Sequence, residues 1–161
     1  MLIRSIADYL EYFEGIRRRT INFAEAIPVD KIDWQPKEDE FTCGETIRHL
    51  GSVQLMNTER FAGKQQHYRG HASTLGSSKQ EALIYLSDCD DEAGKLLKRL
   101  PDESLSVKRE DLRGRSISAW RFLMATIEHE VHHRSQLASY LTWMGAEAPQ
   151  LYGIYMEELP Q

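Results

Sequence analysis

The sequence predicts an all-α protein built as a four-helix bundle, and three observations carry that prediction. Apolar residues recur three or four positions apart in four long segments, as one face of an α-helix requires. Capping residues, glycines and prolines bound these segments. Strand signals are weak, and only residues 106–112 could form a short extended piece. Four such helices pack most simply as one bundle, so we expect a single domain over residues 1–161.

The first two helices are predicted over residues 5–27 and 42–61. Pro28 ends the first helix, whose apolar face consists of Ile6, Leu10, Phe13, Ile16, Phe23 and Ile27. The second begins with a capping box, in which the Thr42 hydroxyl accepts from the backbone of Glu45 and the Glu45 carboxylate reaches back. Gly63 is its stop signal. The basic run at residues 17–19 is interpreted as a solvated helix face.

The third and fourth helices are predicted over residues 78–100 and 117–144, with Pro101 and Gly145 after them. A helical wheel of the fourth helix gives one stripe with Trp120, Met124, Ile127, Val131 and Ala138, and a second with Phe122, Thr126, His129, His133, Leu137 and Tyr140. Two apolar stripes need cover on two sides, either from the bundle and a partner subunit or from the bundle alone, so the pattern is compatible with a homodimer but does not require one. The connections 28–41, 62–77 and 101–116 are longer than usual bundle turns, so they could cross over the bundle or cover a site.

Composition narrows the classes of function. The 20 Lys plus Arg against 25 Asp plus Glu give a net charge of -5, without the basic face that a nucleic-acid partner requires. No apolar run approaches the length of a membrane span, and acidic residues interrupt the N-terminal segment before a signal peptide could form. We therefore expect a cytoplasmic protein that acts on a small molecule, with no nucleic-acid or membrane partner.

The two cysteines, Cys43 and Cys89, are too few and too isolated for a disulfide framework, and we expect reduced thiols. Cys43 lies in the predicted first turn of a helix, where a thiol pKa can fall, although a buried and idle cysteine is the simpler interpretation.

Three of the six histidines lie in the fourth helix, within residues 128–137. His129 and His133 are four residues apart and face the same side of the helix, which is the spacing of two metal ligands, whereas His132 points to solvent. His49 faces inward from the second helix. Burying several imidazoles without a shared purpose costs desolvation each time, so we predict that His49, His129 and His133 converge on a divalent metal.

A second pair of histidines, His67 and His71, has the same four-residue spacing. Gly63 and Gly70 flank this pair and argue against a continuous helix, so both histidines are predicted to lie in a surface loop.

The chain resembles the DinB-like superfamily, also described as DinB/YfiT-like metalloenzymes. The resemblance rests on residues 46–50, 129–137 and 144–153, and on Trp34 and Pro36 before the second helix. It implies a four-helix bundle with an unusual helix order, frequent dimers, and His49, His129 and His133 as ligands of a divalent metal. Some members resemble transferases or isomerases that use a low-molecular-weight thiol such as bacillithiol, mycothiol or glutathione.

Three neutral ligands leave a metal its double charge and an open position, so a bound water or thiol would be activated. Imidazole ligands admit several metals, and we favour zinc or nickel. Glu130 is a candidate general base or acceptor for a ligand imidazole, or else an exposed or interface carboxylate. Arg134 and Tyr152 are candidates for binding the substrate or cofactor.

Two other functions compete with a thiol- or water-activating enzyme. The residues His129, Glu130 and His133 also fit the H-E-x-x-H pattern of a zinc peptidase, which would bind metal without His49. A non-catalytic metal-binding or stress-associated bundle protein would have a metal site without turnover.

Overall fold

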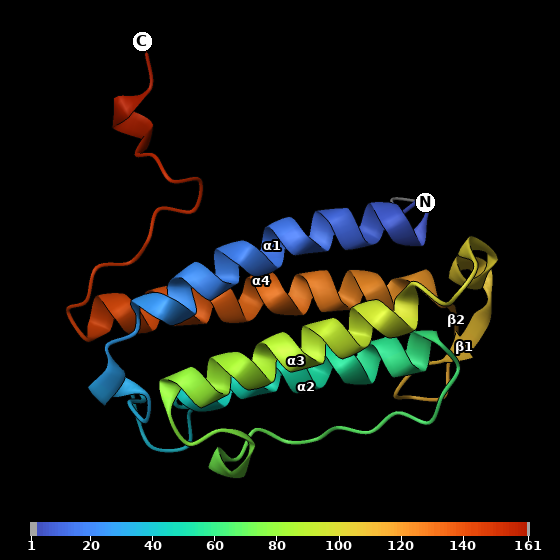
Figure 1. Cartoon of the computed structure of the whole chain (residues 1–161), viewed down its shortest axis with the longest axis horizontal. Coiled ribbons are helices and arrows are strands. Elements are labelled where there is room, and N and C mark those ends of the chain that lie inside the picture. Colours follow the sequence, from blue (N-terminus) through green and yellow to red (C-terminus); the bar gives the residue numbers. More distant parts are fainter. Residues whose placement is uncertain (1–2, 161) are drawn as a thin grey trace.

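The computed structural model describes residues 3–160 and consists of four long helices with a small β-hairpin at one end (Figure 1). The helices are α1 (Ile6–Ala26), α2 (Cys43–Phe61), α3 (Lys79–Leu97) and α4 (Trp120–Trp143). The strands β1 (Lys108–Glu110) and β2 (Ser116–Ser118) pair antiparallel, with Arg109 opposite Ile117. Short 3-10 helices are η1 (Val29–Lys31), η2 (Ser73–Leu75), η3 (Asp102–Ser106) and η4 (Met156–Glu158).

The predicted all-α four-helix bundle is confirmed, and the local signals place most helix ends well. Both halves of the capping box between Thr42 and Glu45 are present at the start of α2. The fourth helix is the main correction, because it begins at Trp120 and not at residue 117. Residues 116–118 pair with residues 108–110, so their backbone groups bond to another strand. The helix α3 also ends earlier than predicted, at Leu97.

The order of the helices around the bundle is α1, α4, α2, α3, so helices that follow one another in the chain are not always neighbours. Figure 1 shows that α2 and α3 run in the same direction, as do α1 and α4. A parallel pair needs a connection that returns along the bundle. At 1.5 Å per residue, the 19 residues of α2 span about 28 Å. The connection 62–77 covers that distance beside α2 and therefore passes along its side chains.

The core has two apolar clusters, one toward each end of the bundle, with a polar layer between them. Arg17, Gln54 and Glu130 are buried in this layer. The prediction of a solvated face for residues 17–19 is therefore wrong for Arg17, although Arg18 is exposed. Arg17 lies in helical phase with buried Phe13 and Thr20, so its side chain points inward.

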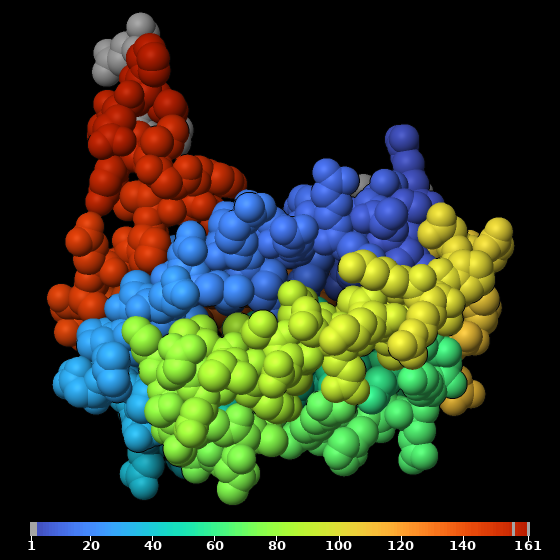
Figure 2. Space-filling model, viewed as in Figure 1, coloured from blue at the N-terminus to red at the C-terminus, as the bar shows by residue number. Residues whose placement is uncertain are grey.

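Three further observations concern membrane spans, the two cysteines and the C-terminal segment. None of the helices in residues 3–160 has the length and hydropathy needed to cross a bilayer. Cys43 and Cys89 are free and buried, and burial raises the pKa of Cys43 to about 12, so the alternative of a low-pKa thiol is wrong. Ala146, Ala148 and Leu151 still pack against the core after α4, and the segment beyond them stands away from the body of the bundle on the side of α1 (Figure 2).

Candidate metal centre

Three imidazoles meet where the first half of α2 faces the middle of α4. His49 comes from α2, and His129 and His133 come from α4. The Nε2 atoms of His129 and His49 lie 2.9 Å apart, and the possible ligand atoms of all three rings lie within 4.8 Å of one another. Two nitrogens on one tetrahedral ion, each about 2.0–2.1 Å from it, would be about 3.3 Å apart. The spacing of the three histidines therefore fits a single transition-metal ion.

The second ring nitrogen of His133 has a partner that fixes its tautomer. Nδ1 lies 2.7 Å from Oε1 of Gln136, whose amide nitrogen donates to the Tyr140 hydroxyl at 2.7 Å. Tyr140 in turn donates to the backbone carbonyl of Phe41 at 3.0 Å. Because an amide oxygen only accepts, Nδ1 of His133 carries the proton and Nε2 keeps its lone pair. This lone pair is free for a metal.

His49 has an equivalent support from the connection 62–77. Its Nδ1 lies 2.7 Å from the hydroxyl of Tyr68, and the same hydroxyl lies 2.8 Å from Nδ1 of His71. The His71 ring also packs against Phe41, with ring centroids 4.4 Å apart. The loop predicted for His67 and His71 is confirmed and His67 is exposed, but His71 is half-buried beside the site. Sequence analysis missed Tyr68, His71 and Phe41, and the spacing of His71 from His67 was the only signal.

Buried polar side chains of α2 tie this connection to the bundle. Arg48 donates from Nε to the carbonyl of His71 and from Nη1 to the carbonyl of Gly76, both at 2.7 Å. The Ser52 hydroxyl donates to the carbonyl of Gly70 at 2.6 Å. Gly76 has a φ of +139°, and a Cβ there would lie 2.7 Å from the backbone of Glu81. These contacts hold the connection 62–77 beside His49.

All three imidazoles are neutral at physiological pH. Burial, reinforced by the neighbouring His133 ring, lowers the pKa of His49 to about 4 and that of His129 to about 3. Burial also lowers the pKa of His133. Only the neutral imidazole has a lone pair for a metal, so these shifts keep the binding form available without a prior loss of protons.

The other predicted site residues lie elsewhere. His132 is exposed, as predicted. Glu130 is buried and faces α1, where its Oε1 lies 3.3 Å from Nε of Arg17, so it is neither exposed nor turned toward the histidines. Arg134 is buried on the same side of α4, and burial lowers its pKa. Tyr152 is exposed on the segment after α4. The structure therefore groups the three predicted ligands but not Glu130, Arg134 or Tyr152.

Fold and site together define a class of protein: a four-helix bundle whose second and fourth helices present three histidines to one point. The chain belongs to the DinB family, whose family model matches residues 2–160.

Known proteins of this kind are similar over most of the chain. The YjoA protein of Bacillus subtilis is 26% identical over 146 residues, which cover 84% of this chain and 88% of that protein. A DinB-like protein from Bacillus cereus has a TM-score of 0.72 at 20% identity, covering 94% of this chain and 99% of its own. YfiT from Bacillus subtilis is described as a probable metal-dependent hydrolase with an unusual four-helix bundle topology. It has a TM-score of 0.66 at 13% identity, and the match covers 88% of this chain and 89% of YfiT. These structural likenesses bear on the fold alone.

Proposed function

We propose that this chain is a divalent-metal-dependent enzyme in which His49, His129 and His133 hold the ion and a thiol or a water is the activated group. The observation that carries the proposal is the convergence of three neutral imidazoles within 4.8 Å. Three histidine ligands leave a position open on the ion, which is the arrangement of catalytic sites. Zinc or nickel suits this ligand set, and bacillithiol, mycothiol or glutathione would be the thiol.

A divalent ion in such a site acidifies a bound water toward neutral pH and deprotonates a bound thiol. The surrounding side chains set the conditions for that chemistry. With Nε2 of His49 on the ion, its Nδ1 would carry the proton and donate to the Tyr68 hydroxyl, which would in turn donate to Nδ1 of His71. The Phe41 ring packs against His49 and His71 and contributes to the burial that lowers the pKa of His49. The protein thus supplies orientation and a partly desolvated site.

The zinc peptidase alternative does not fit the position of Glu130. In that class the glutamate beside the first histidine must face the metal as general base. In this chain the Glu130 carboxylate pairs with Arg17 of α1, with Oε1 3.3 Å from Nε. We therefore propose a structural role for Glu130 and count His49 as a required ligand.

The test is the metal content of protein purified without a histidine tag and reconstituted with zinc or nickel. We expect about one equivalent per chain for the wild type. His49→Ala should lose it, and His132→Ala, an exposed histidine of the same helix, should keep it. A wild type that stays metal-free, or a His49→Ala variant that binds as well as the wild type, contradicts the three-histidine site. Bound metal with no thiol- or water-dependent turnover on electrophilic substrates would leave the non-catalytic alternative.

We also propose that a second copy of the chain covers an apolar face of α1 and α4. Tyr12 and Val131 are 61% and 41% exposed, and Tyr12, Met124 and Ile127 line a cavity of about 290 Å³. A two-fold pairing would bury these side chains against their symmetry mates. The molar mass from light scattering should be that of a dimer for the wild type and of a monomer for Val131→Glu. A monomeric wild type overturns the homodimer.

A further inference from the structure

An open groove lies on the α2–α4 side of the molecule, at the end that carries the β-hairpin. Its volume is about 600 Å³, and its walls are the last half of α2, the first half of α4 and the turn between β1 and β2. We call it the arginine groove. The lining residues used below are Asn57, Arg60, Asp111, Arg113, Arg115, Trp120, Arg121, Ala125 and Glu128. None of these residues has a part in the histidine cluster.

The arginine groove lies on the helix faces that carry the histidines. Asn57 follows His49 by eight residues on α2, and Ala125 precedes His129 by four on α4, so each pair shares a face. At 1.5 Å per residue these separations are about 12 Å and about 6 Å along the helices. Arg121, one of the two arginines used below, precedes His129 by eight residues, about 12 Å along α4, so an extended organic molecule that reacts at the histidines would reach it with its other end.

The groove is positively charged. Four arginines line it against two carboxylates, those of Asp111 and Glu128. Arg115 is paired with Asp111, with Nη2 2.7 Å from Oδ2, and Arg60 donates to the carbonyls of Glu110 and Asp111. In the described part of the chain, Arg113 and Arg121 have no ion-pair partner. These two guanidinium groups are available for an external anion.

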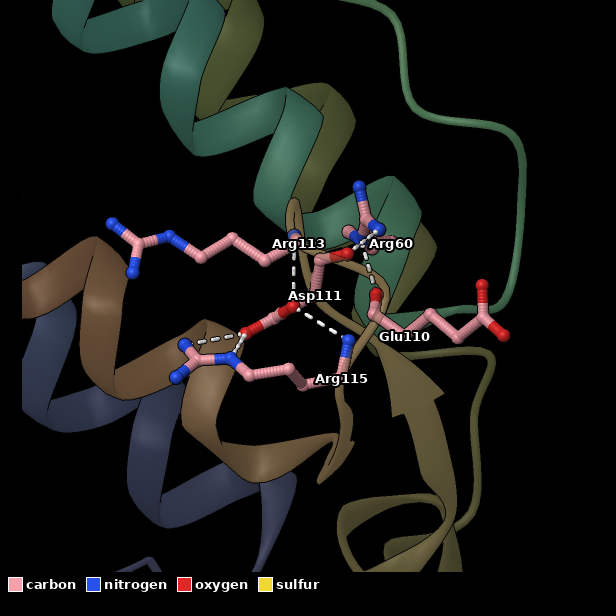
Figure 3. A network of polar contacts seen from close by, with 5 residues as sticks. All are labelled: Arg60, Glu110, Asp111, Arg113 and Arg115. Carbon is pink, nitrogen blue, oxygen red and sulfur yellow. Dashed lines mark hydrogen bonds and ion pairs between the residues drawn. The ribbon is translucent and has the colours of Figure 1, made fainter.

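The turn that carries Arg113 is held in place before any ligand arrives. Oδ1 of Asp111 accepts from the backbone amides of Arg113 and Arg115 at 2.8 and 2.9 Å, and Gly114 takes a φ of +72° between them. Figure 3 shows the side chains of Arg113 and Arg115 extending on the same side of this turn. Arg121 lies over the Trp120 ring, 5.7 Å from its centroid. The backbone at Arg113 and the guanidinium of Arg121 are therefore placed before a ligand binds, which lowers the entropy lost on binding a carboxylate.

We propose that the arginine groove binds a carboxylate of the substrate or thiol cosubstrate whose reacting atom lies at the three histidines. Guanidinium groups match the planar carboxylate with two parallel hydrogen bonds, and the apolar wall at Trp120 packs against the organic chain that joins the two ends. The ligand class is therefore a carboxylate-bearing organic molecule, not a neutral one. This proposal rests on the proposed function, because it assigns the far end of that site.

The test measures the binding of S-methylglutathione by calorimetry to protein reconstituted with zinc and to metal-free protein. This probe has two carboxylates and a blocked sulfur, and its diethyl ester, which keeps the ammonium group but has no carboxylate, serves as the counterpart. We expect saturable binding of the probe and little binding of the ester. The double variant Arg113→Ala/Arg121→Ala should bind the probe at least about tenfold more weakly, with unchanged zinc content. Arg113→Lys/Arg121→Lys should recover part of the affinity, which separates lost charge from lost folding.

The matched control is Lys37→Ala, which removes a cation from the groove on the opposite side of the histidines. Equal affinity of the wild type and the double alanine variant overturns the proposal, as does equal binding of the ester or an absence of binding to the wild type. The zinc content of the protein tests the three-histidine site independently of the binding measurement. If no zinc binds, the metal-free measurement still shows whether the arginines hold the carboxylates.

Discussion

The buried ion pair between Arg17 and Glu130 gives the most direct test of what Glu130 does. The side chains are 3% and 2% exposed, and Nε and Oε1 lie 3.3 Å apart in the polar layer between the two apolar clusters. Replacing either residue with alanine leaves the other as an unpaired ionisable group in the core, where burial raises the pKa of Glu130 and Arg17 acts against that rise. If Glu130 has only this structural role, its loss should lower stability and leave the metal centre intact.

The size of the effect follows from the burial and the geometry. Removing one partner of a buried pair costs about 3–5 kcal/mol. Oε1 of Glu130 and Nε of Arg17 have no direct hydrogen-bond partner, although Nη2 of Arg17 donates to Gln54 at 2.6 Å. We therefore expect the lower end, about 3 kcal/mol for Glu130→Ala. In a domain of this size that corresponds to a fall in Tm of about 6–12 °C.

Chemical denaturation of metal-free protein is the assay, with Glu130→Ala, Arg17→Ala and the double variant forming a cycle. The double variant should be more stable than the sum of the single losses predicts, because no charge remains buried alone. Glu128→Ala, an exposed carboxylate on the same helix, should change stability by less than about 0.5 kcal/mol. The reasoning is refuted if the cycle shows no coupling. A Glu130→Gln variant that keeps its stability and its metal but loses turnover would restore the catalytic role.

Two further predictions concern the residues that support the metal centre and the arginine groove. Tyr68→Phe removes the acceptor of the His49 Nδ1 proton, so zinc affinity in a chelator competition should fall about 10–100-fold, whereas His67→Ala in the same loop should have no effect. Equal zinc affinity of Tyr68→Phe and wild type would contradict this support. Hydrogen bonds from the Arg115 backbone and side chain hold the pKa of Asp111 at about 2. Because this pKa is lower than the unfolded value of about 3.9, the ionised carboxylate stabilises the fold at pH values above about 3.9. This contribution is lost as the pH falls toward 2. Unfolding curves of Asp111→Asn should lack that part of the pH dependence; an identical pH profile would contradict the assignment.

Local patterns predicted the helices well because their causes are local. The capping box of Thr42 and Glu45 joins residues three apart, so the sequence alone defines the start of α2. Ile117 continues the apolar pattern of the fourth helix, yet it lies in β2 opposite Arg109. That choice depends on a strand partner and a turn, which helical periodicity does not contain. Arg17 was misjudged because successive helix positions differ by about 100°, so three adjacent arginines cannot share one environment.

The same distinction applies to the candidate site. The phase of two helices predicted that His49, His129 and His133 face inward, and the structure places them together. Tyr68 and His71 lie in a connection without periodicity, and their positions depend on Arg48 bonds that span 23 and 28 residues. No local signal fixes such a path.

The topology explains why that connection reaches the site at all. Since α2 and α3 are parallel, the chain must travel back beside α2 before α3 can begin (Figure 1). A short turn, as between antiparallel helices, would leave Nδ1 of His49 facing solvent. The long return instead brings Tyr68 to that atom and His71 behind it. An unusual helix order thus provides, as a direct consequence of its connection, the hydrogen bonds that a histidine ligand needs to keep one tautomer.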